Sequence, residues 1–245
     1  MDVHVARDLG DAVQVLAAQP GTDVIAGGTD VMVEINFGRK RPERVLVIDR
    51  LTELRHLDDL GGRFRMAATY TYAEMLERGA GSRALWEAAR TVGSPQIRNA
   101  GTLGGNLGTC SPAGDTLPVL AALGATVWLR SAAGTRSLPF GEFMIGPKRS
   151  ARRPDELILG AEWDDAGPAQ VFMKIGTRNA MVISIAGLAL VVDRRRRRVG
   201  IGLGSCGPTI LRAPEAEALA AGLFDEQGWE RAFDPSPAEC DEFGR

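Results

Sequence analysis

Histidine is nearly absent from this sequence, and its scarcity argues against several classes of enzyme. The 245 residues contain two histidines, His4 and His56. A Ser-His-Asp or Cys-His mechanism would have to use one of them. Neither lies near a G-x-S-x-G nucleophile motif or beside a residue at metal-ligand spacing. The sequence therefore predicts neither a hydrolytic triad nor a metal site.

Cysteine is scarce as well. Cys110, Cys206 and Cys240 are widely separated and form no C-x-x-C pair. Three thiolates cannot supply the four that an iron–sulfur cluster normally needs, nor can three cysteines form a complete disulfide set. The phosphate-binding pattern G-x-x-x-x-G-K-[ST] is also missing, which argues against a P-loop nucleotidase.

Long apolar runs and a charge excess are missing too. No run of about 18 uncharged apolar residues occurs, so we expect no membrane span. Residues 1–8 lack the apolar core of a signal peptide, and a cytoplasmic location fits best. The formal net charge of −2 gives no electrostatic sign of nucleic-acid binding. The basic run Arg194 to Arg198 lies between two apolar alternating segments, which favours a solvated hairpin tip over a polyanion site.

The remaining sequence predicts an α+β protein of one domain with two or three lobes. Thr71 and Glu74 form a capping-box pattern before one helix, and Pro20-Gly21 ends another. Residues 31–35 fit a short helix or a strand, and the chain turns polar from Asp225 onward, as in a loose tail. We expect helices over residues 8–19, 72–78, 85–92, 117–123 and 213–221. We expect strands over residues 24–25, 44–49, 64–68, 125–130, 157–163, 170–175, 182–192 and 199–203, the last three antiparallel.

Glycine is plentiful in one place. Four glycines fall between Gly101 and Gly108, and a shorter stretch of similar character spans Ala26 to Asp30. Glycine clusters suit sharp turns and close backbone approach, and freed N–H groups can form an anion-binding concavity. Two such loops would suit a ligand with two phosphates. Two ordinary tight turns are the alternative that residue types leave open.

Two further features have competing interpretations. Asp115 could accept hydrogen bonds from sugar hydroxyls, or it could cap the helix that follows. The stretch Gly202 to Gly207 matches G-x-G-x-x-G, but its last glycine precedes Pro208 instead of opening a helix. A strand-end turn is the better interpretation of that stretch.

Several motifs together resemble a known family. They are Ile25 to Asp30, Ile97 to Asn106, Ser111 to Asp115, Lys174 to Ser184 and Leu211 to Glu217, in that order. The chain is similar to the FAD-binding medium subunit of the xanthine dehydrogenase and carbon monoxide dehydrogenase family of molybdenum hydroxylases. The resemblance covers roughly residues 1 to 220.

The resemblance implies a fold and a cofactor, FAD. The fold would be a two-lobed FAD domain of the vanillyl-alcohol-oxidase (PCMH) type over residues 1–56 and 57–169. A small lobe with an antiparallel sheet and helices would follow over residues 170–245. Both glycine loops would hold the pyrophosphate through backbone N–H groups. The implied cofactor-binding residues are Ile25, Ala26, Gly27, Gly28, Thr29, Asp30, Val31, Thr102, Leu103, Gly104, Gly105, Asn106, Ser111, Asp115, Ile158 and Lys174.

Individual roles follow from the same resemblance. Asp115 would bond a sugar or ribityl hydroxyl, Ile158 would pack on the flavin and Lys174 would lie beside it. A core isoleucine and a solvated lysine are the ordinary alternatives for the last two. No catalytic side chain is required, because the flavin carries the redox chemistry.

The family also implies partners. A large molybdopterin-binding subunit would hydroxylate the substrate, and a small subunit with two [2Fe–2S] clusters would relay electrons to this FAD. The acceptor would be NAD, a quinone or oxygen. The resemblance departs at residues 236–245, where a C-terminal helix with a Ser-Ala-Glu-Tyr-Arg-Arg-like pattern is not found. A free-standing flavin-dependent reductase and a flavin-free structural subunit are the alternatives.

Overall fold

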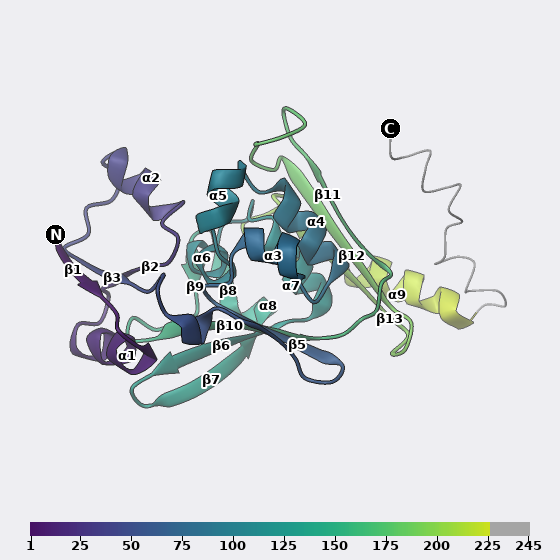
Figure 1. Ribbon diagram of the computed structural model, residues 1–245. Coiled ribbons are helices and arrows are strands. Elements are labelled where there is room, and N and C mark those ends of the chain that lie inside the picture. Colours follow the sequence, from purple (N-terminus) through teal and green to yellow (C-terminus); the bar gives the residue numbers. More distant parts are fainter. Residues whose placement is uncertain (226–245) are drawn as a thin grey trace.

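The computed structural model describes residues 1–225, whose strands form three main sheets that follow one another along the chain (Figure 1). The first sheet is parallel, in the order β1-β3-β2. Its strands are β1 (Asp2–Val5), β2 (Asp23–Ile25) and β3 (Arg44–Val47), with helices α1 (Leu9–Ala18) and α2 (Val31–Asn36) between them and the 3-10 turn η1 (Thr52–Leu54) after them. Parallel neighbours need such crossover connections.

Helix α1 begins where the sequence predicts. The Asp8 carboxylate accepts a hydrogen bond from the N–H of Asp11 at 2.7 Å, which satisfies one of the open donors at the helix start. Ala12 and Leu16 are fully buried on one face and belong to the same small core as Leu46 of β3. Helix α2, in contrast, contains no buried residue.

The second sheet is antiparallel, in the order β4-β5-β10-β6-β7. Its strands are β4 (Leu57–Asp59), β5 (Arg63–Ala67), β6 (Thr126–Ser131), β7 (Gly134–Pro139) and β10 (Leu157–Asp164). The helices around it are α3 (Tyr72–Arg78), α4 (Arg83–Thr91), α5 (Pro95–Ala100), α6 (Leu103–Thr109), α7 (Thr116–Leu123) and α8 (Phe140–Phe143). The hairpin of β8 (Met144–Gly146) and β9 (Arg149–Ser150) precedes β10.

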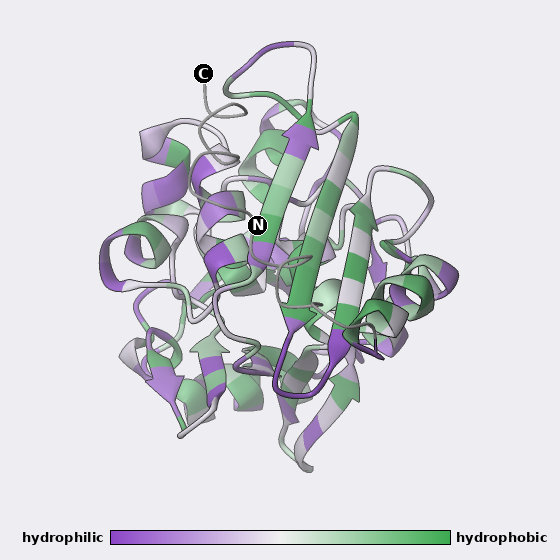
Figure 2. Ribbon diagram, turned by 90° about the vertical axis from the view of Figure 1, so that its right-hand side faces the viewer, coloured by the Kyte–Doolittle hydropathy of each residue, from purple (hydrophilic) through white to green (hydrophobic). Residues whose placement is uncertain are grey.

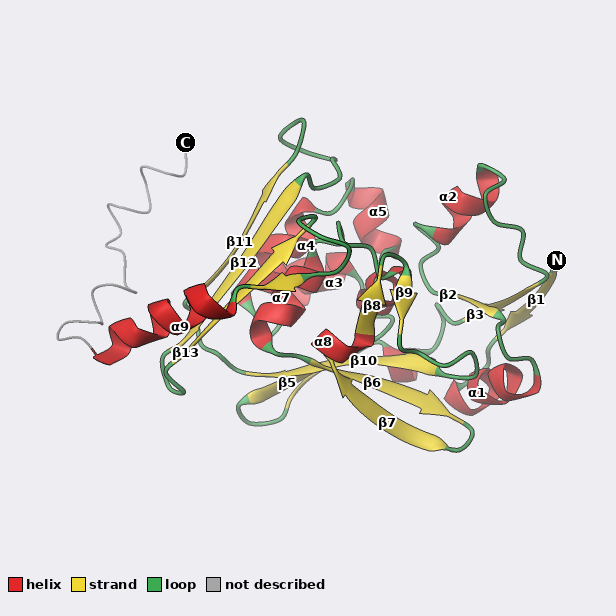
Figure 3. Ribbon diagram, turned by 180° about the vertical axis from the view of Figure 1, so that it is seen from behind, coloured by secondary structure: helices red, strands yellow, loops and turns green. Residues whose placement is uncertain are grey.

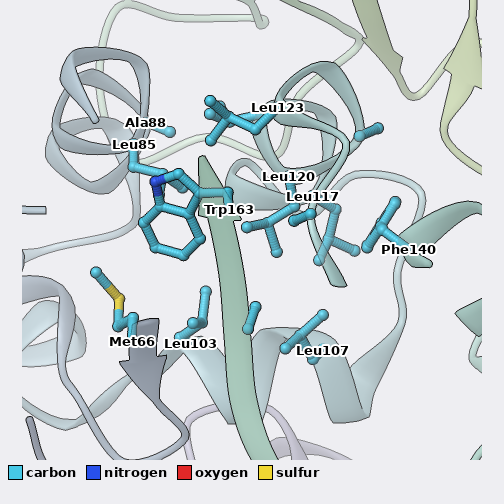
Figure 4. Close-up of a cluster of buried hydrophobic side chains, with 14 of the residues drawn as sticks. Met66, Leu85, Ala88, Leu103, Leu107, Leu117, Leu120, Leu123, Phe140 and Trp163 are labelled. Carbon is cyan, nitrogen blue, oxygen red and sulfur yellow. The ribbon is translucent and has the colours of Figure 1, made fainter. Parts of the chain in front are cut away.

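The main core lies between this sheet and its helices. Figure 4 shows Trp163 of β10 beside leucines of α4, α6 and α7. Every residue of α7 is buried, which explains its continuous apolar run. The indole N–H of Trp163 donates to the carbonyl of Gly81 at 3.2 Å, so this large side chain is buried without an unpaired polar atom.

The third sheet packs its inner face on α4 and α7 and is antiparallel, in the order β11-β12-β13-β14. It comprises β11 (Gln170–Ile175), β12 (Ala186–Asp193), β13 (Arg198–Gly204) and β14 (Leu211–Arg212), followed by α9 (Pro214–Gly222) and the 3-10 turn η2 (Leu223–Asp225). Figure 2 shows this sheet facing the viewer, with apolar residues along its strands. Helix α9 and helix α2 lie at opposite ends of the molecule (Figures 1 and 3).

Glycines bring β13 close to α7. A Cβ atom on Gly202 would lie 2.0 Å from the carbonyl oxygen of Pro118, and one on Gly200 would lie 2.0 Å from that of Ala122. The G-x-G-x-x-G lookalike therefore belongs to a strand that packs on a helix. The prediction of a strand end in place of a dinucleotide turn is confirmed.

The arginine run forms the predicted hairpin tip between β12 and β13. Three of its guanidinium groups are paired with carboxylates of the same molecule. Arg195 lies 3.3 Å from Asp165, and Arg196 lies 2.8 Å from Asp193. Arg197 pairs with Asp225.

Most predicted elements are present, and some predictions are wrong. The capping box at Thr71 is confirmed, and residues 31–36 form a helix. The strand expected from Val182 begins at Ala186, while β1, β4, β7, β8, β9, β14, α5, α6 and α8 were not predicted. The loose tail and the missing C-terminal pattern concern residues 226–245, which lie outside the described residues. Within residues 1–225, no helix has the length and apolarity to cross a bilayer.

Candidate functional site

The first glycine stretch is a loop, as predicted. It leaves β2 at Ile25 and enters α2 at Val31, with Gly28 in the left-handed region at φ 69°. The N–H groups of Gly27, Gly28 and Thr29 donate to no acceptor among residues 1–225. Unpaired backbone donors at a loop are suited to an anionic ligand.

The second glycine stretch is not a loop, and the expectation of a second loop is wrong. Residues 95–100 and 103–109 form helices α5 and α6. Thr102 caps α6, because its Oγ1 accepts the N–H of Gly105 at 2.9 Å. The N–H groups of Leu103 and Gly104 donate to the carbonyls of Tyr70 and Ala68 at 3.1 and 2.8 Å. The main-chain N–H groups of residues 103–106 are therefore used within the protein.

The two stretches meet through main-chain atoms. A Cβ atom on Gly27 would lie 1.6 Å from the carbonyl oxygen of Ala100, so only glycine allows this approach. The hydroxyl of Thr109 donates to the carboxylate of Asp30 at 3.2 Å, which makes a second link. The end of α5 and the end of α6 thus both contact the first loop.

A cavity of about 620 Å³ lies between the two stretches. Cavities of this size are typical of small-molecule and cofactor sites. Twelve of the predicted site residues line it: Ala26, Gly27, Gly28, Thr29, Asp30, Val31, Thr102, Gly104, Gly105, Asn106, Ser111 and Ile158.

Four predicted residues are not part of the lining. Ile25 is the last residue of β2, and Leu103 is fully buried in the main core. Asp115 and Lys174 form an ion pair at 2.6 Å, with side chains 7% and 9% exposed. Asp115 makes no side-chain cap bond to α7, so its predicted capping role is wrong. The alternative of a solvated Lys174 is wrong as well.

One wall of the cavity is apolar. Ile158 of β10, Val92 after α4 and Ile183 before β12 belong to the lining, together with Tyr72. Ile158 is 7% exposed, and a Cβ on Gly108 would come within 3.8 Å of its Cδ1. Such a wall suits a flat aromatic ring system.

Charged residues that sequence reasoning missed also line the cavity. Lys40 pairs with Asp23 at 2.5 Å, and Lys148 pairs with Glu34 at 2.7 Å. The hydrogen bond to Glu34 raises the pKa of Lys148. Arg152 is also in the lining, and burial lowers its pKa. These residues lie in parts of the chain without a motif, so no sequence signal identified them.

Neither histidine lies in the cavity lining. His4 Nε2 is 2.9 Å from Asp11, and His56 Nε2 is 3.3 Å from Asp58. Among residues 1–225, no three His, Cys, Asp or Glu side chains gather in a way that could hold a metal ion.

Comparison with known proteins agrees with this geometry. Residues 1–162 match the family described as the FAD binding domain in molybdopterin dehydrogenase. The chain belongs to this family. FAD is therefore its cofactor, and the protein is an FAD-binding subunit of the xanthine and carbon monoxide dehydrogenase type of oxidoreductase.

Individual relatives support the family membership. The nicotinate dehydrogenase FAD-subunit of Eubacterium barkeri is 38% identical over an alignment of 180 residues, which covers 69% of this chain and 61% of that protein. The putative xanthine dehydrogenase FAD-binding subunit of Escherichia coli K12 is 29% identical, covering 89% of this chain and 78% of that protein. The chain thus spans less than two thirds of the first of these relatives.

Solved structures agree with the fold. A Cu,Mo-CO dehydrogenase chain superposes with a TM-score of 0.83 at 23% identity, covering 89% of this chain and 79% of that chain. A carbon monoxide dehydrogenase chain from Hydrogenophaga pseudoflava gives 0.82 at 24% identity, covering 91% and 84%. At this level of identity the likeness shows a shared fold of mixed helices and sheets.

The residues present fit FAD. The first loop offers unpaired N–H groups of the kind that a pyrophosphate needs, and the lining includes apolar side chains that would suit a flavin ring. Gly105 and Gly108 have no side chains, so none extends from α6 into the cavity at these two positions. The second stretch therefore contributes shape more than main-chain donors.

Proposed function

We propose that this chain is the electron-transferring FAD subunit of a molybdenum hydroxylase complex. It would receive electrons from [2Fe–2S] clusters of a partner subunit and pass them to an external acceptor. The observation that carries the proposal is the cavity between the two glycine stretches, whose lining combines unpaired backbone donors with apolar side chains.

In this proposal the residues of the chain bind and orient. FAD, when bound, supplies the chemistry of accepting and releasing electrons. The N–H groups of Gly27, Gly28 and Thr29 would hold the pyrophosphate. Ile158 and Val92 would exclude water from one face of the ring, and no side chain would need to move a proton.

The finer description of the fold belongs to the same proposal. We assign residues 1–56 and 57–169 to the two lobes of a PCMH-type FAD domain and residues 170–245 to the third lobe. The change from a parallel sheet to two antiparallel sheets near these boundaries supports the assignment for the described residues.

Partners follow from the names of the relatives. A glyceraldehyde dehydrogenase medium chain of Sulfolobus acidocaldarius and the carbon monoxide dehydrogenase medium chain of Hydrogenophaga pseudoflava are both parts of larger assemblies by name. We infer a large molybdopterin-binding subunit, a small subunit with two [2Fe–2S] clusters, and NAD, a quinone or oxygen as acceptor. The cytoplasm is the compartment we propose.

The decisive experiment purifies a tagged copy from its native host. We expect the visible flavin band together with molybdenum, iron and two further polypeptides. A solitary protein that carries flavin and reduces a substrate by itself would indicate a free-standing reductase. A protein without a flavin band, even after incubation with FAD, would indicate a structural subunit.

A further inference from the structure

Asp115 and Lys174 meet a third residue in a closed triangle of hydrogen bonds. Lys174 Nζ lies 2.6 Å from Asp115 Oδ2 and donates to the carbonyl of Thr91 at 3.0 Å. The hydroxyl of Thr91 lies 2.9 Å from the same Asp115 Oδ2, and it shares its single proton between this oxygen and the carbonyl of Ala88 at 2.8 Å. The ammonium and the carboxylate therefore each have two partners within the triangle.

The triangle joins three elements that are distant in the sequence. Thr91 ends α4, Asp115 immediately precedes α7, and Lys174 lies in β11 of the third sheet. Lys174 is 59 residues from Asp115 and 83 from Thr91. The hydrogen bonds and the ion pair of the triangle thus connect the third sheet to the helices that cover the second sheet.

Burial makes this bond costly to break. Both charged side chains are more than nine-tenths buried. Burial raises the pKa of Asp115, and the hydrogen bond and charge of Lys174 act against that rise. Removing either partner would leave the other charge buried and unpaired, which is strongly destabilising.

Two members of the triangle are next to cavity-lining residues in the chain. Val92 follows Thr91 in the chain, and Gly114 precedes Asp115. Both of these neighbours line the cavity, whereas the members of the triangle do not. From Lys174, β11 continues into residues 176–185, which include the lining residue Ile183.

We propose that Asp115 and Lys174 are positioning residues, whose ion pair holds residues of the cavity lining in place. Their pairing holds β11 against α4 and α7 and thereby sets the places of Val92, Gly114 and Ile183. This role exists without the cofactor, whereas a direct contact to a ribityl hydroxyl or to the flavin would exist only with it. The inference rests on the FAD-binding cavity and not on the proposed partner subunits.

The test compares the full chain with and without FAD. Lys174→Met keeps most of the side-chain volume and removes the charge, while Asp115→Asn keeps the shape. For the flavin-free protein of each variant we expect a lower melting temperature and about tenfold faster tryptic cleavage after Arg178, because the segment that follows β11 is released. Arg178 is exposed and lies within that segment.

A double variant measures the coupling. Asp115→Asn combined with Lys174→Met removes both charges, so its loss of stability should be smaller than the sum of the two single losses, again without FAD. If a single variant does not fold, Thr91→Val removes one hydroxyl and tests the same triangle more gently. Arg195→Gln is the matched control, because the exposed Arg195 pairs with Asp165 at the tip of the β12–β13 hairpin.

The opposite result would overturn the inference. Flavin-free variants with wild-type melting temperature and cleavage rate, but with FAD affinity weakened about tenfold or more, would show direct ligands of the cofactor. A chain that binds no FAD at all would refute the cofactor assignment, yet the flavin-free measurements would still decide the positioning role.

Discussion

At the scale of single residues, the site depends on places where a side chain would not fit. Gly27 is the clearest case, because a Cβ atom at this position would clash with the carbonyl of Ala100. Gly104 packs in the same way on Ala68, where a Cβ would lie 2.6 Å from the methyl group. These glycines bring protein main chain together, and the ligand cavity results from that contact.

Gly27→Ala should therefore separate the first loop from α5. We expect a destabilisation of roughly 3 kcal/mol, since the opposing atom is a backbone carbonyl that cannot rotate away. The purified variant should retain little FAD, as measured by the ratio of flavin to protein absorbance. Gly141→Ala is the control, because a Cβ there would meet no atom within 4 Å. A Gly27→Ala protein with normal flavin content would contradict the close approach.

At the scale of elements, the segment before β10 is held to β7 by one buried carboxylate. Glu156 is 2% exposed and accepts two hydrogen bonds from Arg136, at 2.5 and 2.8 Å. It also accepts the N–H of Arg153 at 2.7 Å. Burial alone would raise the pKa of Glu156, but these donors outweigh burial and lower it below its ordinary value.

This shift predicts a dependence of stability on pH. A carboxyl with a lowered pKa in the folded state stabilises the protein above its unfolded pKa, and the contribution is lost as the pH falls through the folded value. We expect the wild type to lose stability from about pH 5 downward, and Glu156→Gln to lose about 2 kcal/mol at neutral pH with a flatter acid profile. Melting curves between neutral and acidic pH measure both effects. Glu142→Gln, at an exposed position, should leave the profile unchanged.

The contact between β13 and α7 is a second element-scale feature. Because Gly202 lies against the carbonyl of Pro118, Gly202→Ala must push the third sheet away from α7. We expect a loss of about 1–3 kcal/mol in unfolding free energy. Denaturant titration of flavin-free protein provides the measurement, again against Gly141→Ala. Equal midpoints for the two variants would show that the sheet does not depend on this contact.

At the scale of the whole molecule, the cavity is shared by parts of the chain that are otherwise distinct. The first loop follows β2 of the parallel sheet, Ile158 lies in β10 of the second sheet, and Ile183 precedes β12 of the third. A ligand that fills this cavity contacts all three. Its binding energy therefore adds to the stability of their arrangement.

FAD should accordingly raise the melting temperature of the flavin-free protein. At a concentration 100-fold above its dissociation constant, a ligand specific for the folded state adds about 2.7 kcal/mol. For a chain of this size the expected rise is roughly 5–10 °C. Calorimetry with increasing FAD measures it, and riboflavin, which lacks the pyrophosphate, should give a smaller rise. No rise with FAD would contradict the binding site.

How far the sequence predicts this structure depends on the distance between interacting residues. Local patterns identified α1, α3 and most strands, because caps and periodicity are properties of neighbouring residues. The second glycine stretch gives a wrong prediction, because glycine disfavours helices whereas the cap at Thr102 favours one. The Asp115–Lys174 pair and the Lys148–Glu34 pair depend on three-dimensional proximity, which no local pattern reports.

The meeting of the two glycine stretches has a consequence for directed evolution. At this contact the Cα of Gly27 lies against the carbonyl group of Ala100. The side chain of Ala100 does not take part in it. A library randomised at position 100 should yield many flavin-loaded clones, whereas one randomised at position 27 should return only the parental residue. Of the two residues that meet at this contact, position 100 should therefore tolerate substitution and position 27 should not.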